Sequence, residues 1–343
     1  MPAKRETQEY VKSGLPYDIL REIYKDSRVS LQELGRRFNI SYHNIAAALK
    51  ELEKRYDIEY TLELDEAALG FTEGRIITIK FENPAPSIDF LRERFTKDIF
   101  VQDAYLATGD FDLLLYVVGI TSKDFKAWEW RLRMDLGEYR PVFKSSIMDE
   151  KSIGFLALRS ELIKESPILS NSEKKVLMLL NNNSRARLKE ICEKCKIKNP
   201  MHVVYILRKL KEKGIIKKFS ALTQKPDKKI ISAYGLRLIP TKEHHHKFFI
   251  NFAKELLNET ASEITNDYCF IADVTGAYDG MYLCTFEDGE RLSKRGPDLI
   301  QRLWAVESPR IDRAMLTYLI IGKWPFHLEE YESYKRLFEK ESK

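Results

Sequence analysis

A turn that occurs twice constrains the fold of this chain more than any other feature. Residues 108–118 read TGDFDLLLYVV, and residues 275–285 read TGAYDGMYLCT. Each copy places Thr, Gly, an aromatic residue and Asp before a run of residues suited to a strand. A repeat at this separation indicates two similar structural units in one chain. The units are not equivalent, because Asp110 in the first copy is Ala277 in the second.

Helical patterns precede both turns. Residues 17–60 and 172–219 each contain short segments with apolar residues at helical spacing, followed by a strand-like segment. The third helical segment of each unit begins at a good N-cap, Ser41 or Asn199. The stripes expected to be buried on these two helices are Ile45, Leu49 and Leu52, and Val203, Leu207 and Leu210. This pattern predicts a winged helix-turn-helix in each unit.

A strand–helix–strand–strand–helix–strand series follows each helix-turn-helix, and this order is typical of a ferredoxin-like module. In the first unit the segments are 75–82, 87–95, 101–109, 112–120, 123–134 and 140–148. In the second they are 232–239, about 242–258, 267–276, 280–286, a helix to about 304 and 312–321. Gly109 and Gly276 then lie between the second and third strands, where a hairpin needs positive φ.

The sequence therefore predicts an α+β fold of two tandem units. The expected segments are winged helix-turn-helix 1 (1–64), ferredoxin-like module 1 (65–154), a linker helix (155–169), winged helix-turn-helix 2 (170–229), ferredoxin-like module 2 (230–322) and a C-terminal helix (323–343).

Charge is concentrated in one part of the chain. The whole chain has a net charge of +5, but residues 159–229 contain 19 Lys and Arg against 7 Asp and Glu, a net charge of +12. Such asymmetry indicates a polyanionic partner. The N-terminus is polar and the apolar runs are too short for a bilayer span, so no membrane partner is expected. Four cysteines in 343 residues make no disulfide framework, which predicts a cytoplasmic protein.

The order of these parts resembles the Lrp/AsnC family of prokaryotic transcription regulators. In the first unit the resemblance rests on YDIL (17–20), SLQELGRRFNIS (30–41) and ATGDFDLLLYVV (107–118). In the second it rests on the apolar helix positions, EKGIIKKF (212–219) and VTGAYDGMYL (274–283). The resemblance implies a transcription regulator, and abundant Lys and Glu favour a thermophilic, archaeal source.

Two departures from the family pattern bear on the prediction. Family members usually have one unit per chain, so we expect an intramolecular pseudo-dimer or a homodimer of two-unit chains. The family also generally has Gly after the third helix. The second unit keeps Gly214, but the first reads KRYDIEY (54–60), so its turn into the strand is expected to differ.

The second helix-turn-helix is the predicted principal reader of double-stranded DNA. A recognition helix offers its first turns to base edges, while basic residues around it bind phosphates. The expected contacts on the helix are Met201, His202, Tyr205, Arg208 and Lys209, with phosphate contacts from Arg185, Arg187, Lys217 and Lys218. A basic face that is merely solvated is the alternative.

The first helix-turn-helix is nearly neutral. Its corresponding residues are Tyr42, His43, Asn44, Ala47 and Lys50, with Arg36 and Arg37 upstream. These residues predict either DNA contact or docking to another protein, such as a basal transcription factor or RNA polymerase.

The repeated hairpin is the predicted site of a small effector, such as an amino acid, because family members bind ligands near this turn. The resemblance assigns Gly109, Asp110 and Asp112 to such a site in the first unit, and Gly276 and Asp279 in the second. A carboxylate can hold an ammonium group. Solvated turn residues are the alternative.

Neither a metal nor another cofactor is expected. Cys192 and Cys195 form a CxxC on a predicted helix with no second ligand pair, and His244, His245 and His246 point in different directions on a helix. Cys269 and Cys284 are expected in the core. Some relatives of this architecture decarboxylate tetrapyrroles, but no His lies between 44 and 201. The sequence therefore predicts no enzyme and no catalytic residues, with a tetrapyrrole decarboxylase as the alternative.

Overall fold

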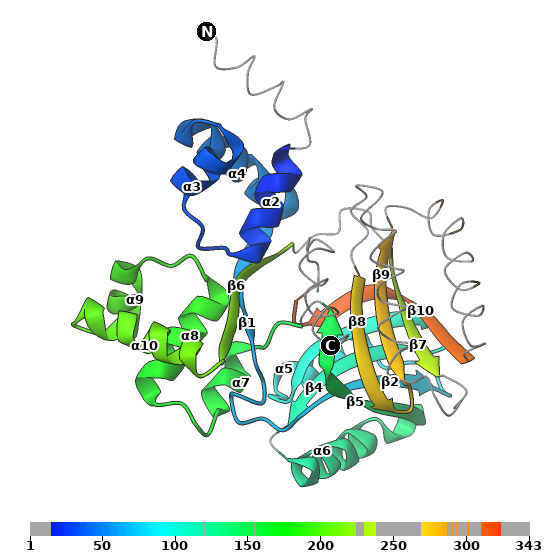
Figure 1. Cartoon of the computed structure of the whole chain (residues 1–343). Coiled ribbons are helices and arrows are strands. Elements are labelled where there is room, and N and C mark those ends of the chain that lie inside the picture. Colours follow the sequence, from blue (N-terminus) through cyan, green and yellow to red (C-terminus); the bar gives the residue numbers. More distant parts are fainter. Residues whose placement is uncertain are drawn as a thin grey trace, which may run out of the picture. The chain divides into compact units, whose positions relative to one another are not determined.

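The chain folds into two compact units. The computed structural model describes residues 15–119, 121–153, 156–223, 230–237, 269–286 and 310–323, with the single residues 290, 293 and 301. The helical unit contains the described residues of 15–69 and 163–223, and the sheet unit contains those of 70–162 and 230–323 (Figure 1). No helix in these parts of the chain has the length and apolarity needed to cross a lipid bilayer.

Two helix-turn-helix groups make up most of the helical unit. The first consists of α2 (Leu15–Lys25), α3 (Leu31–Phe38), α4 (Tyr42–Tyr56) and β1 (Ile58–Leu64). The second consists of α8 (Asn171–Asn182), α9 (Leu188–Cys195), α10 (Pro200–Glu212) and β6 (Ile216–Thr223), and α7 (Ser160–Glu165) precedes it. The predicted caps are confirmed, because Ser41 accepts a hydrogen bond from the backbone of Asn44 and Asn199 accepts one from that of Met201.

The predicted buried stripes are confirmed with one exception. Leu207 on α10 is only half-buried, and Ile206 takes its place in the core beside Val203 and Leu210. The helix therefore faces the core with a spacing of three and four residues, which is the helical repeat.

The two groups share the turn between their second and third helices despite their different sequences. The turn between the second and third helices has positive φ at Asn39 (55°) and at Lys196 (58°). The turn after the third helix has positive φ at Asp57 (48°) and at Gly214 (70°). The expected difference is confirmed, because α4 ends directly at Asp57, whereas α10 continues through Lys213 in a helical conformation before Gly214. Asp is among the residues that tolerate the left-handed conformation.

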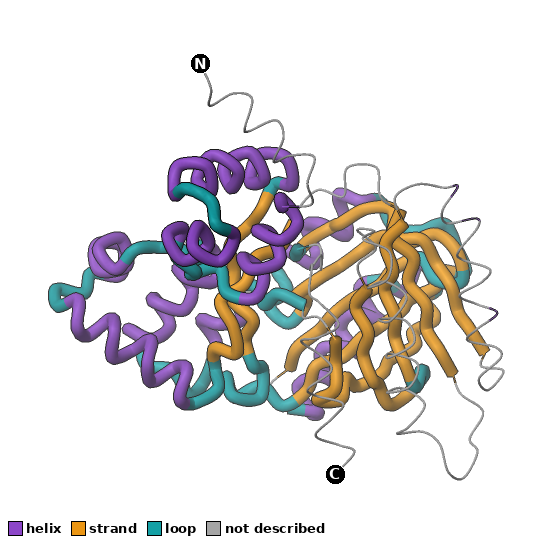
Figure 2. Tube along the Cα trace, turned by 45° about the horizontal axis from the view of Figure 1, so that its top comes forward, coloured by secondary structure: helices purple, strands orange, loops and turns teal. Residues whose placement is uncertain are grey.

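The strands of the two groups pair with each other. β1 and β6 form an antiparallel two-stranded sheet in which Ile58 lies opposite Thr223 and Leu62 opposite Phe219. In Figures 1 and 2 these strands lie side by side, with α2–α4 and α8–α10 around them. Each predicted winged helix-turn-helix thus completes its strand pair with the strand of the other.

The sheet unit contains two sets of four strands with the same order. In the first set β2 (Glu73–Phe81), β3 (Val101–Gly109), β4 (Leu113–Gly119) and β5 (Pro141–Ile153) run in the order β3-β4-β2-β5. In the second, β7 (Ile230–Arg237), β8 (Cys269–Gly276), β9 (Gly280–Phe286) and β10 (Arg310–Ile321) run in the order β8-β9-β7-β10. The pairs β5–β8 and β10–β3 join the two sets into a closed ring.

Helices α5 (Ile88–Thr96) and α6 (Ser122–Asp135) cover one face of the first strand set. Phe95, Trp128 and Leu132 from these helices are buried with Ile77 and Leu115 from the strands. A short 3-10 helix, η1 (Gly137–Tyr139), leads into β5. The helices predicted at 242–258, up to 304 and in 323–343 lie outside the described residues.

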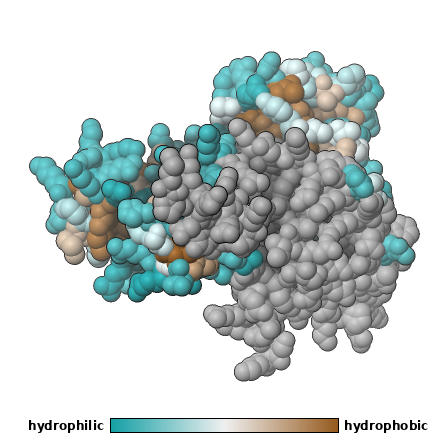
Figure 3. All heavy atoms as spheres, turned by 90° about the horizontal axis from the view of Figure 1, so that it is seen from above, coloured by the Kyte–Doolittle hydropathy of each residue, from teal (hydrophilic) through white to brown (hydrophobic). Residues whose placement is uncertain are grey.

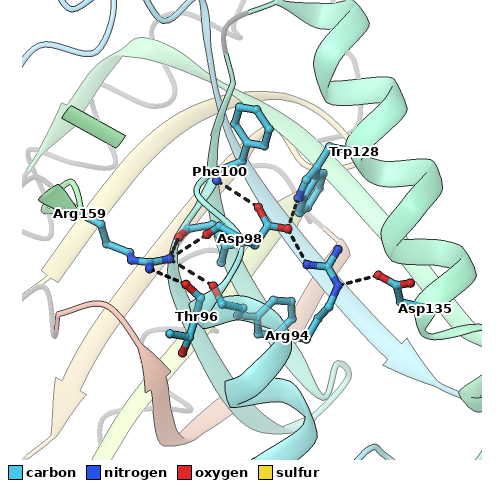
Figure 4. A network of polar contacts seen from close by, with 9 residues as sticks. Arg94, Thr96, Asp98, Phe100, Trp128, Asp135 and Arg159 are labelled. Atoms are coloured by element: carbon cyan, nitrogen blue, oxygen red, sulfur yellow. Dashed lines mark hydrogen bonds and ion pairs between the residues drawn. The ribbon is translucent and has the colours of Figure 1, made fainter. Parts of the chain in front are cut away.

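A polar network secures the loop after α5 (Figure 4). The Asp98 carboxylate accepts hydrogen bonds from the indole of Trp128 (2.7 Å) and from Arg94 (2.8 Å). The guanidinium of Arg159, in the predicted linker, donates to the carbonyls of Phe95, Thr96, Asp98 and Val101. The carbonyls of Phe95 and Thr96 belong to the last turn of α5, which leaves them without intrahelical partners. These hydrogen bonds fix the start of the linker to the sheet unit.

Candidate nucleic-acid interface

The first helix of each helix-turn-helix docks on the strand of the other. Thr61 on β1 donates its hydroxyl to the carbonyl of Asn181 on α8 (2.8 Å). In the matching contact, Ser220 on β6 donates its hydroxyl to the carbonyl of Tyr24 on α2 (3.0 Å). All four residues are buried. Buried polar groups that find partners stabilise one defined arrangement, because unmade bonds are costly.

The residues that follow these two helices repeat the exchange. The amide of Ser27 donates to the carbonyl of Phe219 (2.8 Å), and the amide of Ser184 donates to that of Tyr60 (3.1 Å). The hydroxyls of Ser27 and Ser184 lie 2.6 Å apart and share a buried hydrogen bond. The two groups are therefore joined by reciprocal contacts at matching positions, so one chain holds α4 and α10 in a single unit.

Two arginines complete this interface. The Arg28 guanidinium lies over the Phe219 ring at 5.0 Å, and that of Arg185 lies over the Tyr60 ring at 5.1 Å. Burial lowers the pKa of Arg28, and burial, with the hydrogen bond to Glu53, raises the pKa of Tyr60. Cation–π attraction holds the charge of Arg185 on an aromatic face of the other group, and its phosphate contact stays a prediction.

The exposed face of α10 carries the other predicted contacts. Met201, His202, Tyr205 and Arg208 are all exposed, and the His202 and Tyr205 rings stack at 6.4 Å. Arg208 forms an exposed ion pair with Glu212 (2.7 Å). Surface pairs of this kind are weak because water screens them, so DNA phosphate can compete for Arg208.

Lys209 lies on the side of α10 that faces α8. Its ammonium pairs with Glu173 at 2.7 Å, and Glu173 also caps α8 by accepting the amide of Ser170. Burial alone would raise the pKa of Glu173, but the hydrogen bonds from Lys209 and Ser170 lower it to about 2. Lys209 therefore connects two helices, and its DNA contact stays a prediction.

Lys217 and Lys218 lie on β6, within the two-stranded sheet. Lys217 is exposed but pairs with Asp65 (3.1 Å). Lys218 is half-buried opposite Glu63, and burial lowers its pKa. The strand pairing explains both positions, and the predicted phosphate contacts of these two residues remain untested. Arg187 is exposed at the N-cap of α9.

The corresponding surface of the first group has fewer exposed basic side chains. Tyr42, His43, Ala47 and Lys50 are exposed on α4, and Asn44 is half-buried. Arg36 is exposed on α3, while Arg37 pairs with Glu22 and Glu33. On the face that Figure 3 shows, the coloured part of the surface is mostly hydrophilic and contains separate hydrophobic patches.

Three exposed lysines near α10 do not belong to the contacts predicted from the sequence. Lys189 lies on α9, and Lys196 and Lys198 lie in the turn between α9 and α10. Within the described residues no ion pair engages them. The high net charge of the segment indicated a basic surface but did not single out these three lysines. They stand out only in the fold, where other lysines of the segment form ion pairs.

The repeated hairpins lie at the junctions between the two strand sets. Gly109 and Gly276 both have a φ of +145°, which confirms the expected positive φ. A Cβ at Gly109 would lie 2.3 Å from the carbonyl oxygen of Arg313 on β10, and one at Gly276 would lie 2.6 Å from that of Ser145 on β5. Each glycine is therefore required by close approach to the neighbouring strand as well as by its backbone conformation.

The acidic residues of the hairpin have partners within the chain. The Asp110 carboxylate accepts the amide of Arg313 (2.7 Å). The Asp112 carboxylate pairs with Lys80 (2.8 Å) and accepts the amide of Phe81 (2.8 Å). In the second hairpin the backbone of Asp279 bonds to that of Leu236. These contacts give the predicted effector residues structural roles, and effector binding there is untested.

The cysteines behave as core or helix residues. Cys195 and Cys284 are buried, Cys192 is half-buried, and Cys269 lies opposite Cys284 in the strand pair β8–β9. No cluster of potential metal ligands occurs among the residues that the structure describes. His244, His245 and His246 lie outside those residues.

Comparison with known proteins gives the family of the first group. Residues 15–55 match the family described as winged helix-turn-helix DNA-binding. The HTH-type transcriptional regulator LrpC of Bacillus subtilis is 36% identical over 67 residues, which are 19% of this chain and 46% of LrpC. The resemblance to the Lrp/AsnC regulators is confirmed. An uncharacterised HTH-type transcriptional regulator of Pyrococcus furiosus is 26% identical over 148 residues, 43% of this chain and 90% of that protein. This chain matches less than half of the length of LrpC.

A solved structure shares the architecture of nearly the whole chain. The siroheme decarboxylase NirDL aligns with 95% of this chain and 97% of its own, with a TM-score of 0.56 and 12% sequence identity. The fold is therefore one that an enzyme also uses. The prediction that the chain is not an enzyme is contradicted by this likeness, since the absence of familiar catalytic motifs does not exclude an activity that this architecture supports.

Proposed function

We propose that this chain is a DNA-binding transcription regulator of the Lrp type in which a tandem duplication supplies both readers. The observation that carries the proposal is the reciprocal docking of the two helix-turn-helix groups through β1 and β6. Dimeric helix-turn-helix proteins present two recognition helices to half-sites about one helical turn, or roughly 34 Å, apart, or a multiple of it. The fusion would provide such a pair in one chain, as an intramolecular pseudo-dimer.

The second group is the proposed principal reader. Exposed side chains cover the outer face of α10, and the lysines that precede it are exposed as well. The proposed base contacts are Met201, His202, Tyr205 and Arg208, with phosphate contacts from Arg187, Lys189, Lys196 and Lys198. Its basic segment supports this assignment, because phosphate neutralisation supplies most of the non-specific affinity for DNA.

The first group has a less basic surface, and we assign it either a weaker DNA contact or the docking of transcription machinery. Because α4 and α10 present different residues, a single chain should prefer an asymmetric site. Selection of bound sequences from a random pool, followed by footprinting, tests this. Two identical inverted half-sites per chain would refute the tandem-reader proposal.

Salt dependence tests the phosphate contacts. Each phosphate contact contributes a slope of about 0.9 to the plot of log affinity against log salt, so Lys196→Ala and Lys198→Ala should each lower the slope by about that amount. Matched controls are Lys123→Ala and Lys126→Ala, which remove exposed lysines from α6 in the sheet unit. Equal slopes in all four variants would show that the turn before α10 does not contact DNA.

Other partners follow from the same proposal. We also propose that a small effector, such as an amino acid, binds at the hairpins. We propose in addition that two chains associate into a homodimer. Titration calorimetry with the amino acids tests the first, and sedimentation the second. The relatives from Bacillus and Pyrococcus support a prokaryotic, and with the composition an archaeal, source.

A second candidate function is tetrapyrrole decarboxylation, which the likeness to NirDL over nearly the whole chain favours. A structure of NirDL contains an iron-uroporphyrin III analogue. Titrating this chain with an iron uroporphyrin and recording the visible absorption spectrum tests for binding. Incubation with siroheme under reducing conditions, with the product analysed by mass, tests for loss of carbon dioxide.

A further inference from the structure

Three large apolar side chains on α10 are exposed on one side. Met201 is 67% exposed, Val204 38% and Tyr205 60%. Their spacing of three and four residues places them next to one another on the helix surface. The core side of the helix is filled separately by Val203, Ile206 and Leu210, so these exposed residues do not serve the fold of the unit.

The surroundings of this apolar patch are basic. Lys196 and Lys198 are exposed immediately before the helix, and Lys189 is exposed on α9. A hydrophobic protein groove or a second copy of this surface would bring these charges close to one another or bury them, which is costly. A polyanion that offers apolar groups between its charges satisfies both features.

Double-stranded DNA is such a polyanion. The C5-methyl group of thymine is the apolar group that base edges present in the major groove, and apolar side chains contact it. Met201 lies in the first turn of α10, the part of a recognition helix that reaches base edges. Methionine adapts its shape readily, and the ring of Tyr205 lies nearly parallel to that of His202.

We propose that Met201 and Tyr205 read thymine methyl groups in the half-site bound by the second helix-turn-helix. This inference rests on the proposed DNA-binding function and adds the chemical group that is recognised. The matching positions of α4, counted from its cap Ser41, are His43 and Ala47. They lack large apolar side chains, so the two half-sites differ in their dependence on thymine methyls.

Replacing single thymines by deoxyuridine tests the proposal, because it removes the methyl group and keeps base pairing. The DNA is the best site from selection, and affinity is measured by fluorescence anisotropy at constant salt. The full chain should lose about fourfold in affinity at each contacted thymine, as expected for one buried methyl. Met201→Ala and Tyr205→Ala should bind the thymine site more weakly than the wild type. Each variant should also lose the difference in affinity between thymine and deoxyuridine at the base that its own side chain contacts.

The chain offers matched controls in Met134→Ala and Trp130→Ala, which remove side chains that are 67% and 66% exposed on α6. They should keep the wild-type ratio of thymine to deoxyuridine affinity. If the chain binds its site and every deoxyuridine substitution leaves affinity unchanged, or if both α10 variants keep full discrimination, the inference is overturned and the proposed function stands. If no DNA is bound above non-specific affinity, the proposed function itself fails.

Discussion

A buried carboxylate on β3 should make the stability of the sheet unit depend on pH. Asp103 is completely buried, and its Oδ1 accepts the amide of Lys323 (2.9 Å). Its Oδ2 has no hydrogen-bond partner among the described residues. Burial raises the pKa of Asp103 from 3.8 to about 7, although the charges of Lys323 and Arg159 oppose the shift. The folded protein therefore binds a proton here more tightly than the unfolded chain does.

The sign and size of the effect follow from this difference. The folded-state pKa is raised, so stability is highest below the unfolded value and falls as pH rises, until the folded carboxyl is ionised near pH 7. Between pH 5 and pH 8 the free energy of unfolding should fall by about 3 kcal/mol. This interval covers about two pKa units of the difference between the folded and unfolded states, at 1.36 kcal/mol per unit. Asp103→Asn cannot ionise, so it should lack this loss.

Urea denaturation of the whole chain at pH 5 and pH 8, followed by tyrosine and tryptophan fluorescence, measures the difference. The wild type should lose about 3 kcal/mol more than Asp103→Asn over this interval. Asp89→Asn is the control, because the Asp89 side chain is 92% exposed and pairs only at the surface with Arg92. Equal losses in the wild type and Asp103→Asn would refute the argument that burial of this carboxylate controls the pH dependence.

Two further predictions concern the second hairpin. Gly276→Ala should lower the free energy of unfolding by about 1–3 kcal/mol, because its φ is +145° and the added Cβ would meet the backbone of β5 at 2.6 Å. Gly137→Ala, where a Cβ meets nothing within 4 Å, should be nearly neutral in the same denaturation experiment. Tyr278→Phe should cost about 1–3 kcal/mol, because its buried hydroxyl bonds to Thr78 (2.9 Å) and Asp312 (2.8 Å). An unchanged unfolding midpoint in Gly276→Ala or in Tyr278→Phe would contradict the corresponding contact.

The difference between the two hairpins has a structural explanation. Asp110 uses its carboxylate to bind the backbone of β10 at Arg313. At both junctions the hairpin amide donates to the facing strand, Asp110 to the carbonyl of Arg313 and Ala277 to that of Ser145. At the second junction the side-chain acceptor is Ser146, which accepts the amide of Tyr278. The side-chain acceptor therefore belongs to the hairpin in the first junction and to the facing strand in the second. Neither the sequence repeat nor its Asp-to-Ala difference could reveal this, because the partner strand is remote in sequence.

Local features of the chain were predictable because they depend on neighbouring residues. The caps at Ser41 and Asn199, the buried stripe of α4 and the glycine turns at Gly109 and Gly276 follow from periodicity, capping chemistry and backbone sterics. The strand orders of the two sets also agree with a ferredoxin-like series. The family resemblance rested on these local patterns.

The roles of the charged residues depended on tertiary structure. Arg185, Lys209 and Lys217 belong to the basic segment, but the fold places them against Tyr60, Glu173 and Asp65. Sequence alone determined that the chain contains two similar helix-turn-helix and strand series and that one segment is strongly basic. Only the tertiary structure decided that each first helix docks on the other group's strand, and which basic side chains stay exposed. The physical reason is that such pairings join residues far apart in the chain, whose complementarity leaves no periodic signal in the sequence.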